Sequence, residues 1–432
     1  MPADQVYEDA RKVWNGMTDK QPAMIARCEG TADVVHCVKF ARANDLLVAV
    51  RGGGHSIAGH SVCEGGLMID LAQMHGVRVD AANRSARAGG GAKWLHFDNE
   101  TQAYSLATTG GTNSDTGIGG LTLGGGLGWL AGKYGLTCDN LLSADVVTAD
   151  GSVLTASATE NADLFWGLRG GSGNFGVVTS FEYRVHPVST VLGGLVLYPF
   201  ERARDVLKFY GKFSRAIPDE LNTIAALLSL PDGTKATAIA VCYNGDVASG
   251  EEVLRPLREF GPPMAVQVGP MPYLAVQTML DASFPPGRQY YWKAHLSGEI
   301  KDEALDIVID HFSRVPSPFT VLGFQQLGNA ANRVAPDETA FSHRDALYDF
   351  LMLSGWEDSS QAEANIEWTR ALYDSMRPVL HSGVYVNGLG DDSTLPTTAA
   401  FQPKTFERLV QLKQKYDPDN FFRLNPNIRP GG

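Results

Sequence analysis

Four glycine-rich segments lie within the first 176 residues, and they are the part of the chain best suited to bind a ligand. They read RGGGHSIAGH (51–60), AGGGAKW (88–94), GGTNSDTGIGGLTLGGGLG (110–128) and RGGSGNFG (169–176). Consecutive glycines bring bare backbone N–H groups close together, and such groups bind anions, phosphates above all. One cluster alone often makes only a turn, but four of them predict a long phosphorylated ligand.

Common nucleotide and catalytic motifs do not account for these loops. Residues 171–176 match GxGxxG, but that dinucleotide fingerprint follows a strand and opens a helix. Here the helical pattern LFWGLR precedes the match and the strand pattern VVTSFEYRV follows it. The sequence contains no GxxxxGK[ST] loop, no GxSxG elbow and no HExxH or CxxC spacing for zinc. We therefore expect a phosphate-bearing ligand bound outside a Rossmann fold, and no metal.

The composition is that of a large globular protein. The chain has 432 residues, of which 44% are hydrophobic and 19% charged, enough for two large domains around a ligand cavity. Its net charge is −12 and no segment concentrates basic residues, which argues against a nucleic-acid partner. No long apolar run is present, so we expect no membrane partner. The five scattered cysteines are typical of a reducing compartment, and we predict a cytoplasmic protein.

The N-terminal half alternates short strands with helices, and the strands lead into the glycine loops. A strand at 23–27, a helix at 31–44 capped by Thr31 and a strand at 46–50 form a βαβ unit that ends at the first loop. Short strands, a helix near 92–103 and a hairpin turning at Asp150 and Gly151 indicate a second α/β unit.

After Pro187 the pattern changes to longer strands. Alternating hydrophobicity at 222–230, 234–243, 290–300 and 346–356 is interleaved with amphipathic helices such as 301–315 and 363–380. Alternation indicates that the two faces of a strand meet different surroundings. We therefore predict one sheet in this half, with helices on one of its faces.

Three motifs taken together carry a family resemblance. RGGGHSIAGH, the run GGTNSDTGIGGLTLGGGLGWLAGKYGLTCDNLLSADVVTADG and the end YDPDNFFRLNPNIRP resemble the berberine-bridge-enzyme-like FAD-linked oxidases of the vanillyl-alcohol-oxidase, or PCMH-type, flavoprotein superfamily. The resemblance covers nearly the whole chain. It implies an α+β fold with a PCMH-type FAD-binding domain of two α/β subdomains and a substrate domain whose large antiparallel sheet is flanked by helices. Residues 1–188 would begin the FAD-binding domain, 189–395 would form the substrate-binding domain, and 396–432 would return to the FAD-binding domain.

In this family a histidine of the first glycine loop is joined through a ring nitrogen to the 8α-methyl group of FAD, and His55 occupies that position. A neutral imidazole is a nucleophile, and such a tether favours substrate oxidation. The resemblance predicts pyrophosphate contacts from the first loop, at Arg51, Gly52, Gly53, Gly54, Ser56 and Gly59. It predicts contacts to the rest of FAD from Gly110, Gly111, Asn113, Ser114, Gly117, Gly119, Gly120, Gly125, Val177, Val178, Asn387 and Asn425.

This sequence departs from the family pattern at a second attachment point. Many relatives also link a cysteine to flavin C6, at the start of a CPxVGxxGH motif, and Asn113 stands at that position here. We therefore predict a single covalent link. Cys138, in GLTCDN, matches a small unreactive position in those relatives, and we interpret it as a buried structural thiol.

The expected catalytic base is also absent. Relatives that oxidise sugars or alcohols use the second tyrosine of a YxNY motif, whereas this chain has Tyr385, Asn387 and then Gly388. We predict Tyr385 as the base, with Lys293 nearby to lower its pKa and Tyr291 as a further catalytic residue. Other polar side chains on or beside the predicted strands are Gln325, His343 and Tyr348.

These features predict an FAD-dependent oxidoreductase, an oxidase that passes electrons to O2 after removing hydride from a small ring-containing alcohol or secondary metabolite. Two alternatives stay open. One is a C–N (amine) oxidase similar to 6-hydroxynicotine oxidases, because a nitrogen lone pair can drive hydride transfer with less help from a base. The other is a protein that binds or reoxidises a reactive drug, similar to mitomycin radical oxidases. Both a monomer and a dimer are compatible with the sequence.

Overall fold

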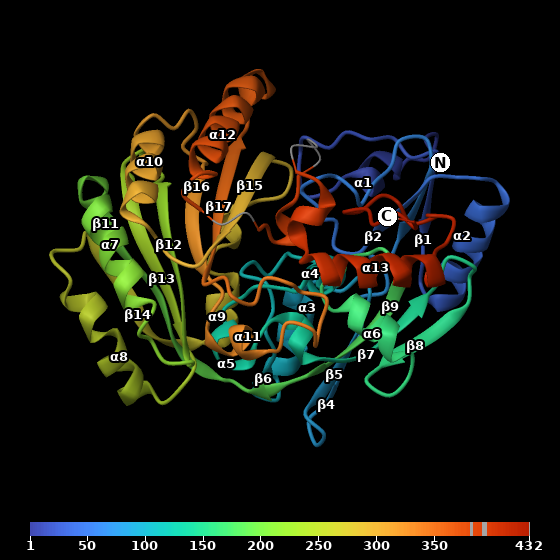
Figure 1. Cartoon of the computed structure of the whole chain (residues 1–432), viewed down its shortest axis with the longest axis horizontal. Helices are drawn as coiled ribbons and strands as arrows, with labels where there is room; N and C mark the ends of the chain where they lie inside the picture. Colours follow the sequence, from blue (N-terminus) through green and yellow to red (C-terminus); the bar gives the residue numbers. More distant parts are fainter. Residues whose placement is uncertain (381–382, 391–394, 432) are drawn as a thin grey trace.

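The structure is a computed structural model, and it describes residues 1–380, 383–390 and 395–431. Two lobes lie side by side (Figure 1). One lobe contains a seven-stranded sheet, and the other contains a three-stranded and a five-stranded sheet. Both chain termini lie in the second lobe.

A three-stranded parallel sheet leads into the first glycine loop. Its strands, in spatial order, are β1 (Met24–Arg27), β3 (Leu67–Asp70) and β2 (Val48–Arg51). Helix α2 (Thr31–Ala43) connects β1 to β2 and buries Val34 and Val38 against the sheet. Because β2 ends at Arg51, the glycines that follow lie at the carboxyl edge of this sheet.

The start of α2 differs from the sequence prediction by one residue. Gly30, not Thr31, holds the N-cap position, and no side chain caps the helix there. The Asp33 carboxylate instead accepts the N–H groups of Glu29 and Gly30, at 2.9 and 3.2 Å. The predicted Thr31 cap is therefore wrong, because an acidic residue in the first turn binds the preceding backbone instead.

A five-stranded antiparallel sheet carries the other glycine loops. Its strands, in spatial order, are β4 (Val77–Asp80), β5 (Ser85–Gly89), β9 (Val177–Arg184), β7 (Leu141–Val147) and β8 (Val153–Ser157). The predicted hairpin joins β7 to β8, and Gly151 has the positive φ (+78°) that its turn requires. The helices of this region are α3 (Trp94–Gln102), α4 (Ile118–Gly124) and α6 (Ala162–Leu168). The GxGxxG match follows α6 and precedes β9, so it is not a Rossmann site.

The seven-stranded antiparallel sheet forms the other lobe. Its strands, in spatial order, are β14 (Ala265–Pro272), β11 (Thr190–Pro199), β13 (Lys235–Tyr243), β12 (Leu221–Ser229), β16 (Val321–Gln326), β17 (Tyr348–Trp356) and β15 (Gln289–Ser297). The helices on its outer face are α7 (Ala203–Phe213), α8 (Val247–Glu259), α10 (Asp302–Ser313) and α12 (Ala362–Met376). One face of the sheet therefore packs on helices, and the other is turned toward the glycine loops (Figure 1).

Strand parity decides which residues face the loops. On β17, Phe350 and Met352 pack into the helix-side core, so Asp349 and Leu351 point to the opposite face. The same reasoning places the even-numbered residues of β15 on the inner face, because Tyr290 lies in a cluster with Trp14 from the chain start.

Short helices and strands make up much of the remaining regular structure. They are α1 (Tyr7–Arg11), β6 (Leu106–Ala107), α5 (Ala131–Tyr134), β10 (His186–Pro187), α9 (Tyr273–Thr278) and α11 (Asn329–Arg333). The last helix, α13 (Pro403–Tyr416), packs on α6. The buried Lys413 ammonium of α13 donates to the carbonyls of Asn174 (2.9 Å) and Phe422 (2.8 Å) and to Asp417 (2.7 Å). The C-terminal segment is thereby fixed to the loop that precedes β9.

Candidate functional site

Three of the glycine loops meet backbone to backbone. A Cβ added at Gly53 would lie 2.3 Å from the Cα of Gly117, and one at Gly52 would lie 3.0 Å from the carbonyl oxygen of Gly90. A Cβ at Gly119 would lie 3.3 Å from the same oxygen. Side chains at Gly52 and Gly53 would therefore push the loops apart, which explains why glycine stands there.

The first loop presents free backbone donors. Among the residues that the structure describes, none accepts a hydrogen bond from the N–H groups of residues 53–56. Gly54 has a φ of +71°, a left-handed conformation of the kind found in nests of backbone N–H groups. Such a nest of N–H groups is an anion-binding concavity. The loop therefore fits the phosphates of FAD, the cofactor that the sequence predicts.

Two side chains of this loop hold its own shape. The guanidinium of Arg51 donates to both carboxylate oxygens of Asp70, at 2.9 and 2.6 Å. The hydroxyl of Ser56 accepts the N–H of His60 at 3.2 Å. Arg51 is thus held by Asp70, and its predicted phosphate contact stays a prediction.

Gly59 ends the first loop and has a φ of +67°. A Cβ there would lie 2.8 Å from the hydroxyl oxygen of Thr18. Glycine is therefore required at Gly59 by both the backbone conformation and the close approach of the chain start.

His55 lies in this loop with its imidazole largely enclosed. Its ring stacks on Trp14, with ring centroids 4.1 Å apart and planes inclined by 18°. Its Nδ1 atom is buried and has no hydrogen-bond partner among the described residues. Burial lowers the pKa of His55 to about 4; the nearby Asp115 raises this pKa by a smaller amount, and Lys93, its ion-pair partner, lowers it. The ring is therefore neutral near pH 7, and its buried nitrogen fits the predicted attachment point.

The loop at 110–125 is anchored by residues in and just after α9. The carbonyl oxygen of Gly111 accepts the side-chain amide of Gln277 at 2.6 Å. The N–H and hydroxyl of Ser114 donate to the carboxylate of Asp281 at 2.9 and 2.6 Å. Segments far apart in the sequence therefore set the position of this predicted flavin loop.

Other predicted contacts of the same loop differ in exposure. Asn113, at the position of the family's second attachment cysteine, is half-buried, and Gly120 is exposed with open space beside it. Gly125 has a φ of +126°, and a Cβ there would lie 2.6 Å from the ring of Phe341. Gly110 is buried in the same loop.

Three further residues predicted to contact FAD come from β9 and the chain end. Val177 and Val178 are buried at the start of β9, and a Cβ at Gly90 would lie 2.2 Å from the Val178 carbonyl oxygen. The side-chain amide of Asn425 donates to the carbonyl of Gly173 at 3.0 Å. Its buried Oδ1 has no partner among the described residues. The tail thus offers an unused acceptor beside the last glycine loop.

Tyr385 lies against the loops and hydrogen-bonds to their backbone. Its hydroxyl oxygen accepts the Gly126 N–H (2.9 Å) and the Asn387 amide (2.8 Å). Burial raises the pKa of Tyr385, so the phenol stays protonated at neutral pH. Asn387 also donates to the carbonyl of Gly120 at 3.2 Å. Tyr385 and Asn387 therefore contact the loop at 110–128, but the surroundings of Tyr385 disfavour its use as a base.

Lys293 and Tyr291 lie on the other face of β15. The ammonium of Lys293 is 5.3 Å from the ring centroid of Tyr373 in α12. The Tyr291 hydroxyl accepts the Nε–H of Arg370, also in α12, at 3.2 Å. Odd-numbered residues of β15 thus pack on the helix layer, so Lys293 and Tyr291 lie on the face of β15 turned away from the glycine loops that Tyr385 contacts.

The three remaining polar candidates divide between the two faces. Tyr348 belongs to the helix-side core, where its hydroxyl hydrogen-bonds to that of Ser214 at 2.6 Å. Gln325 is on the inner face. His343 precedes β17 and lines a small cavity together with Phe341 and Tyr385.

A carboxylate on the inner face, that of Asp349 in β17, is not among the site residues predicted from the sequence. Asp349 is 6% exposed, its Oδ1 is buried, and no described residue hydrogen-bonds to it. Burial raises the pKa of Asp349 to about 7, and its charge contributes to raising the pKa of Tyr385. It lies directly across the strand pair from Gln325, whose Nε2 is also buried and has no hydrogen-bond partner in the described part of the chain. Buried ionisable groups with pKa values near neutrality are concentrated at functional sites.

The signal for Asp349 was present in the sequence. It is the single acidic residue in the apolar strand YDFLMLSGW, one position beyond Tyr348. The alternation of apolar side chains along that strand is visible in the sequence. Whether its odd-numbered or its even-numbered residues face the ligand depends on the packing of α10 and α12.

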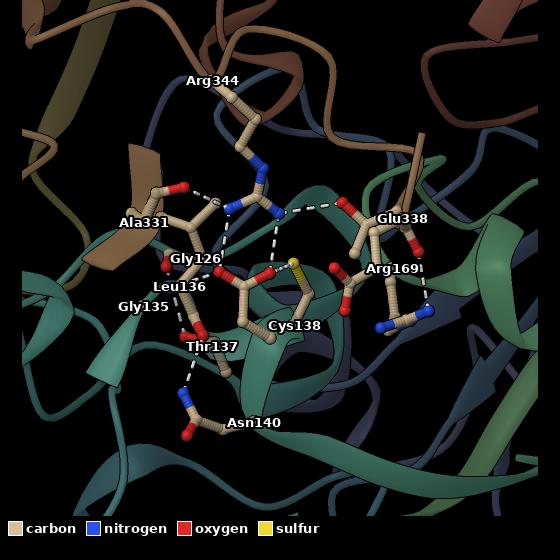
Figure 2. A network of polar contacts seen from close by, with 12 residues as sticks. Gly126, Gly135, Leu136, Thr137, Cys138, Asn140, Arg169, Ala331, Glu338 and Arg344 are labelled. Atoms are coloured by element: carbon tan, nitrogen blue, oxygen red, sulfur yellow. Dashed lines mark hydrogen bonds and ion pairs between the residues drawn. The ribbon is translucent and has the colours of Figure 1, made fainter. Parts of the chain in front are cut away.

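A buried ion pair couples the two halves beside this site (Figure 2). The two Nη groups of Arg344 donate to the carboxylate oxygens of Asp139, at 2.8 and 2.6 Å. Arg344 also donates to the Ala331 carbonyl and the Thr339 hydroxyl, each at 2.8 Å. Asp139 follows the loop that contains Gly126, whereas Arg344 follows Phe341 and His343. The pair therefore fixes the pocket-lining segment at 340–346 against the glycine loops.

Cys138 lies in the same network (Figure 2). Its thiol is fully buried, forms no disulfide and donates to Asp139 at 3.6 Å. Burial raises its pKa, which keeps it as an unreactive thiol.

Comparison with known proteins agrees with this geometry. The family model described as FAD binding domain matches residues 22–157, and the one described as berberine and berberine like matches residues 384–429. An FAD-linked oxidoreductase of Dictyostelium discoideum is 30% identical, over 99% of this chain and 93% of its own length. (R)-6-Hydroxynicotine oxidase of Paenarthrobacter nicotinovorans is 30% identical, over 100% of this chain and 96% of its own.

Solved structures give the same result. 6-Hydroxy-D-nicotine oxidase from Arthrobacter nicotinovorans matches with a TM-score of 0.90 and 27% identity, over 99% of this chain and 97% of that one. A BBE-like protein of Physcomitrella patens has a TM-score of 0.89 at 23% identity, over 100% and 96% of the two chains, and shows the fold alone.

The fold and the three glycine loops that meet one another define an FAD-dependent oxidoreductase. The chain belongs to the berberine-bridge-enzyme-like family of FAD-linked oxidoreductases. The predicted family, the α+β PCMH-type fold and the FAD-dependent oxidoreductase activity are confirmed. The covalent link at His55, the single attachment point, the electron acceptor and the substrate stay predictions.

Two observations on the described part of the chain bear on other functions. No three His, Cys, Asp or Glu side chains in it are grouped so that they could hold a metal ion. None of its helices has both the length and the apolar character needed to cross a bilayer.

Proposed function

We propose that this protein is an O2-using oxidase with FAD attached covalently to His55, and that it removes hydride from a small ring-containing substrate while Asp349 accepts a proton from the same substrate. The observation that carries the proposal is the buried carboxyl of Asp349 on the sheet face turned toward the loop of His55, because its Oδ1 has no hydrogen-bond partner among the described residues. A buried acid without a partner is costly, so a substrate partner gives it a reason to be there.

The residues present fit FAD. The nest at 53–56 would bind the pyrophosphate, the loop at 110–125 and Val178 would line the rest of the cofactor, and His55 would carry the link. Bound FAD supplies the two-electron acceptor for hydride and returns the electrons to O2. A single attachment is supported by Asn113, which has no thiol at the position of the family's second link.

The inner face of the sheet would bind and orient the substrate. Asp349, ionised above about pH 7, would take the proton from a hydroxyl or from a protonated amine through its free Oδ1. The Nε2 group of Gln325, directly opposite, would donate a hydrogen bond to the substrate heteroatom. Leu351 and Trp292 add apolar surface on the same face, which suits a ring. Tyr385, protonated because of its raised pKa, would hold the loop at Gly126 and leave proton transfer to Asp349.

An amine is the second candidate substrate. Relatives at 30 and 27% identity are named as oxidases of 6-hydroxynicotine, a ring-containing amine. A buried carboxylate without a cationic partner would also pair with a protonated amine, which is the specific feature that favours this candidate. Both candidates require the same Asp349 chemistry and differ in the bond that is oxidised.

The test is anaerobic mixing of the holoenzyme with matched pairs of cyclic amines and cyclic alcohols, followed by admission of air. We expect bleaching of the flavin band with members of one class, recovery of the band in air and one H2O2 formed for each substrate oxidised. The Asp349→Asn variant should bind the same compound and bleach much more slowly. A flavoprotein that bleaches with substrate but does not recover in air would contradict the oxidase assignment.

A further inference from the structure

Trp14, near the chain start, lies between the His55 loop and the segment that precedes β15. The backbone N–H of Trp14 donates to the carbonyl of Gly54 at 3.0 Å, and its own carbonyl accepts the N–H of Gly287 at 2.9 Å. The indole N–H donates to the carbonyl of Phe284 at 3.1 Å. Trp14 is only 4% exposed. It is therefore held by the His55 loop on one side and by the segment before β15 on the other.

The indole is the middle layer of an aromatic stack. On one face lies His55, with centroids 4.1 Å apart and planes at 18°. On the other lies Tyr290, with centroids 4.0 Å apart and planes at 5°. Asn15 locks the outer layer, because its side chain exchanges hydrogen bonds with the backbone N–H (3.0 Å) and carbonyl (2.8 Å) of Tyr290.

In the described ranges, no hydrogen bond to Nδ1 fixes the plane of the His55 ring. No described residue hydrogen-bonds to its Nδ1, which is buried. Metal-binding and catalytic histidines are normally oriented by a hydrogen bond to the second ring nitrogen. For His55, stacking on Trp14 orients the ring instead. This contact does not use the ring nitrogens as hydrogen-bonding groups.

We propose that Trp14 is the positioning residue for flavin attachment: by stacking on the His55 imidazole it sets the ring plane and keeps water away while the bond to FAD forms. The inference rests on the proposed covalent link at His55. Trp14 lies before residue 22, where the match to the FAD-binding family model begins, so the contact comes from outside the matched region.

The attachment reaction balances in atoms and electrons when O2 is the oxidant. A bond forms between an imidazole nitrogen and the 8α-carbon of FAD, while one C–H bond of the 8α-methyl group and the N–H bond of the ring break. The two protons and two electrons released reduce one O2 to H2O2. Trp14 takes no part in the electron transfer; its contribution is orientation, and a misplacement of about 1 Å costs about 100-fold in such a step.

The experiment measures attachment separately from binding. Apoprotein is mixed with FAD in air, samples are precipitated with acid at intervals, and the flavin that stays with the protein is divided by the flavin bound before precipitation. We expect Trp14→Leu to attach FAD about 10- to 100-fold more slowly than the wild type. Trp14→Phe, which keeps a flat ring, should restore most of the rate.

Two further variants keep the test decisive. Trp368→Leu is the matched control, since Trp368 is a partly buried tryptophan of α12 in the helix-side core and should attach FAD at the wild-type rate. If Trp14→Leu binds no FAD, Trp14→Met decides, because it keeps apolar volume without a ring plane and should also be slow. Attachment at the wild-type rate in whichever of the Leu and Met variants binds FAD overturns the inference. No covalent flavin in the wild type would instead refute the proposed link at His55.

Discussion

Replacing Asp349 by asparagine should lower activity and raise stability at the same time. The side chain is buried, its Oδ1 has no described partner, and its pKa lies at about 7 instead of its ordinary 3.8. Loss of a general base typically costs about 10²- to 10⁴-fold in rate. Asparagine has nearly the same shape and no charge, so it removes the base without opening a cavity.

The stability gain follows from the same pKa. Below pH 3.8 the carboxyl is protonated in both the folded and the unfolded chain, and the substitution should change little. Between pH 3.8 and about 7 only the unfolded chain ionises, so wild-type stability falls as the pH rises. Above pH 7 the difference between 3.8 and about 7, at 1.36 kcal/mol per factor of ten, corresponds to up to about 4 kcal/mol.

The assay combines two pH series on holoenzyme. Urea unfolding at pH 4.5 and 8.5 should show that Asp349→Asn gains stability over the wild type mainly at the higher pH. Steady-state kcat/KM of the wild type should rise as the pH increases through about 7, and the variant should lose this rise. Asp374→Asn is the control, because Asp374 lies on the surface end of α12. A variant that keeps full activity, or that gains no stability at pH 8.5, would refute the reasoning.

Further substitutions test the neighbouring groups. Tyr385→Phe should leave the pH profile of kcat/KM unchanged and cost about 1–3 kcal/mol of stability, because the Gly126 N–H and the Asn387 amide lose a buried acceptor; loss of the alkaline rise in the profile would instead identify Tyr385 as the base. Arg344→Met should cost about 3–5 kcal/mol in urea unfolding, since it leaves Asp139 buried and unpaired, and the double variant with Asp139→Leu should recover much of that loss. A double variant no more stable than the single one would show that the pair is not coupled.

The architecture was predictable because it depends on local signals. Glycine clusters, short strands and the hairpin at Gly151 determine the FAD-binding half, and alternating hydrophobicity determines the large sheet. The resemblance supplied the role of His55, and the structure adds the free amides at 53–56 that fit it.

The catalytic face was less predictable, because a strand has two faces and the sequence does not say which one meets the ligand. Tyr291 and Lys293 share a parity that packs on α12. The sequence pattern drew attention to Tyr348 and not to Asp349. The two residues are adjacent in the strand, so their side chains lie on opposite faces of the sheet. Long-range packing of α10 and α12 decides between the two, and the sequence pattern alone does not contain it.

Trp14 illustrates a second limit. Its segment has no strong periodicity or motif, and its role arises from contacts with Gly54 and Tyr290, one of them across more than 270 positions. Such a contact is visible only once the two lobes are placed together.

The most direct test of the account is a mass map of the flavin attachment point. Acid-denatured holoenzyme is digested with trypsin, and the yellow peptide is sequenced by fragmentation. The account predicts flavin on the peptide of residues 52–78, localised to His55 rather than to His60 or His75, with no second link. His55→Ala should release all of its FAD into the acid supernatant. Flavin on another residue, or none retained by the wild type, would contradict the central claim.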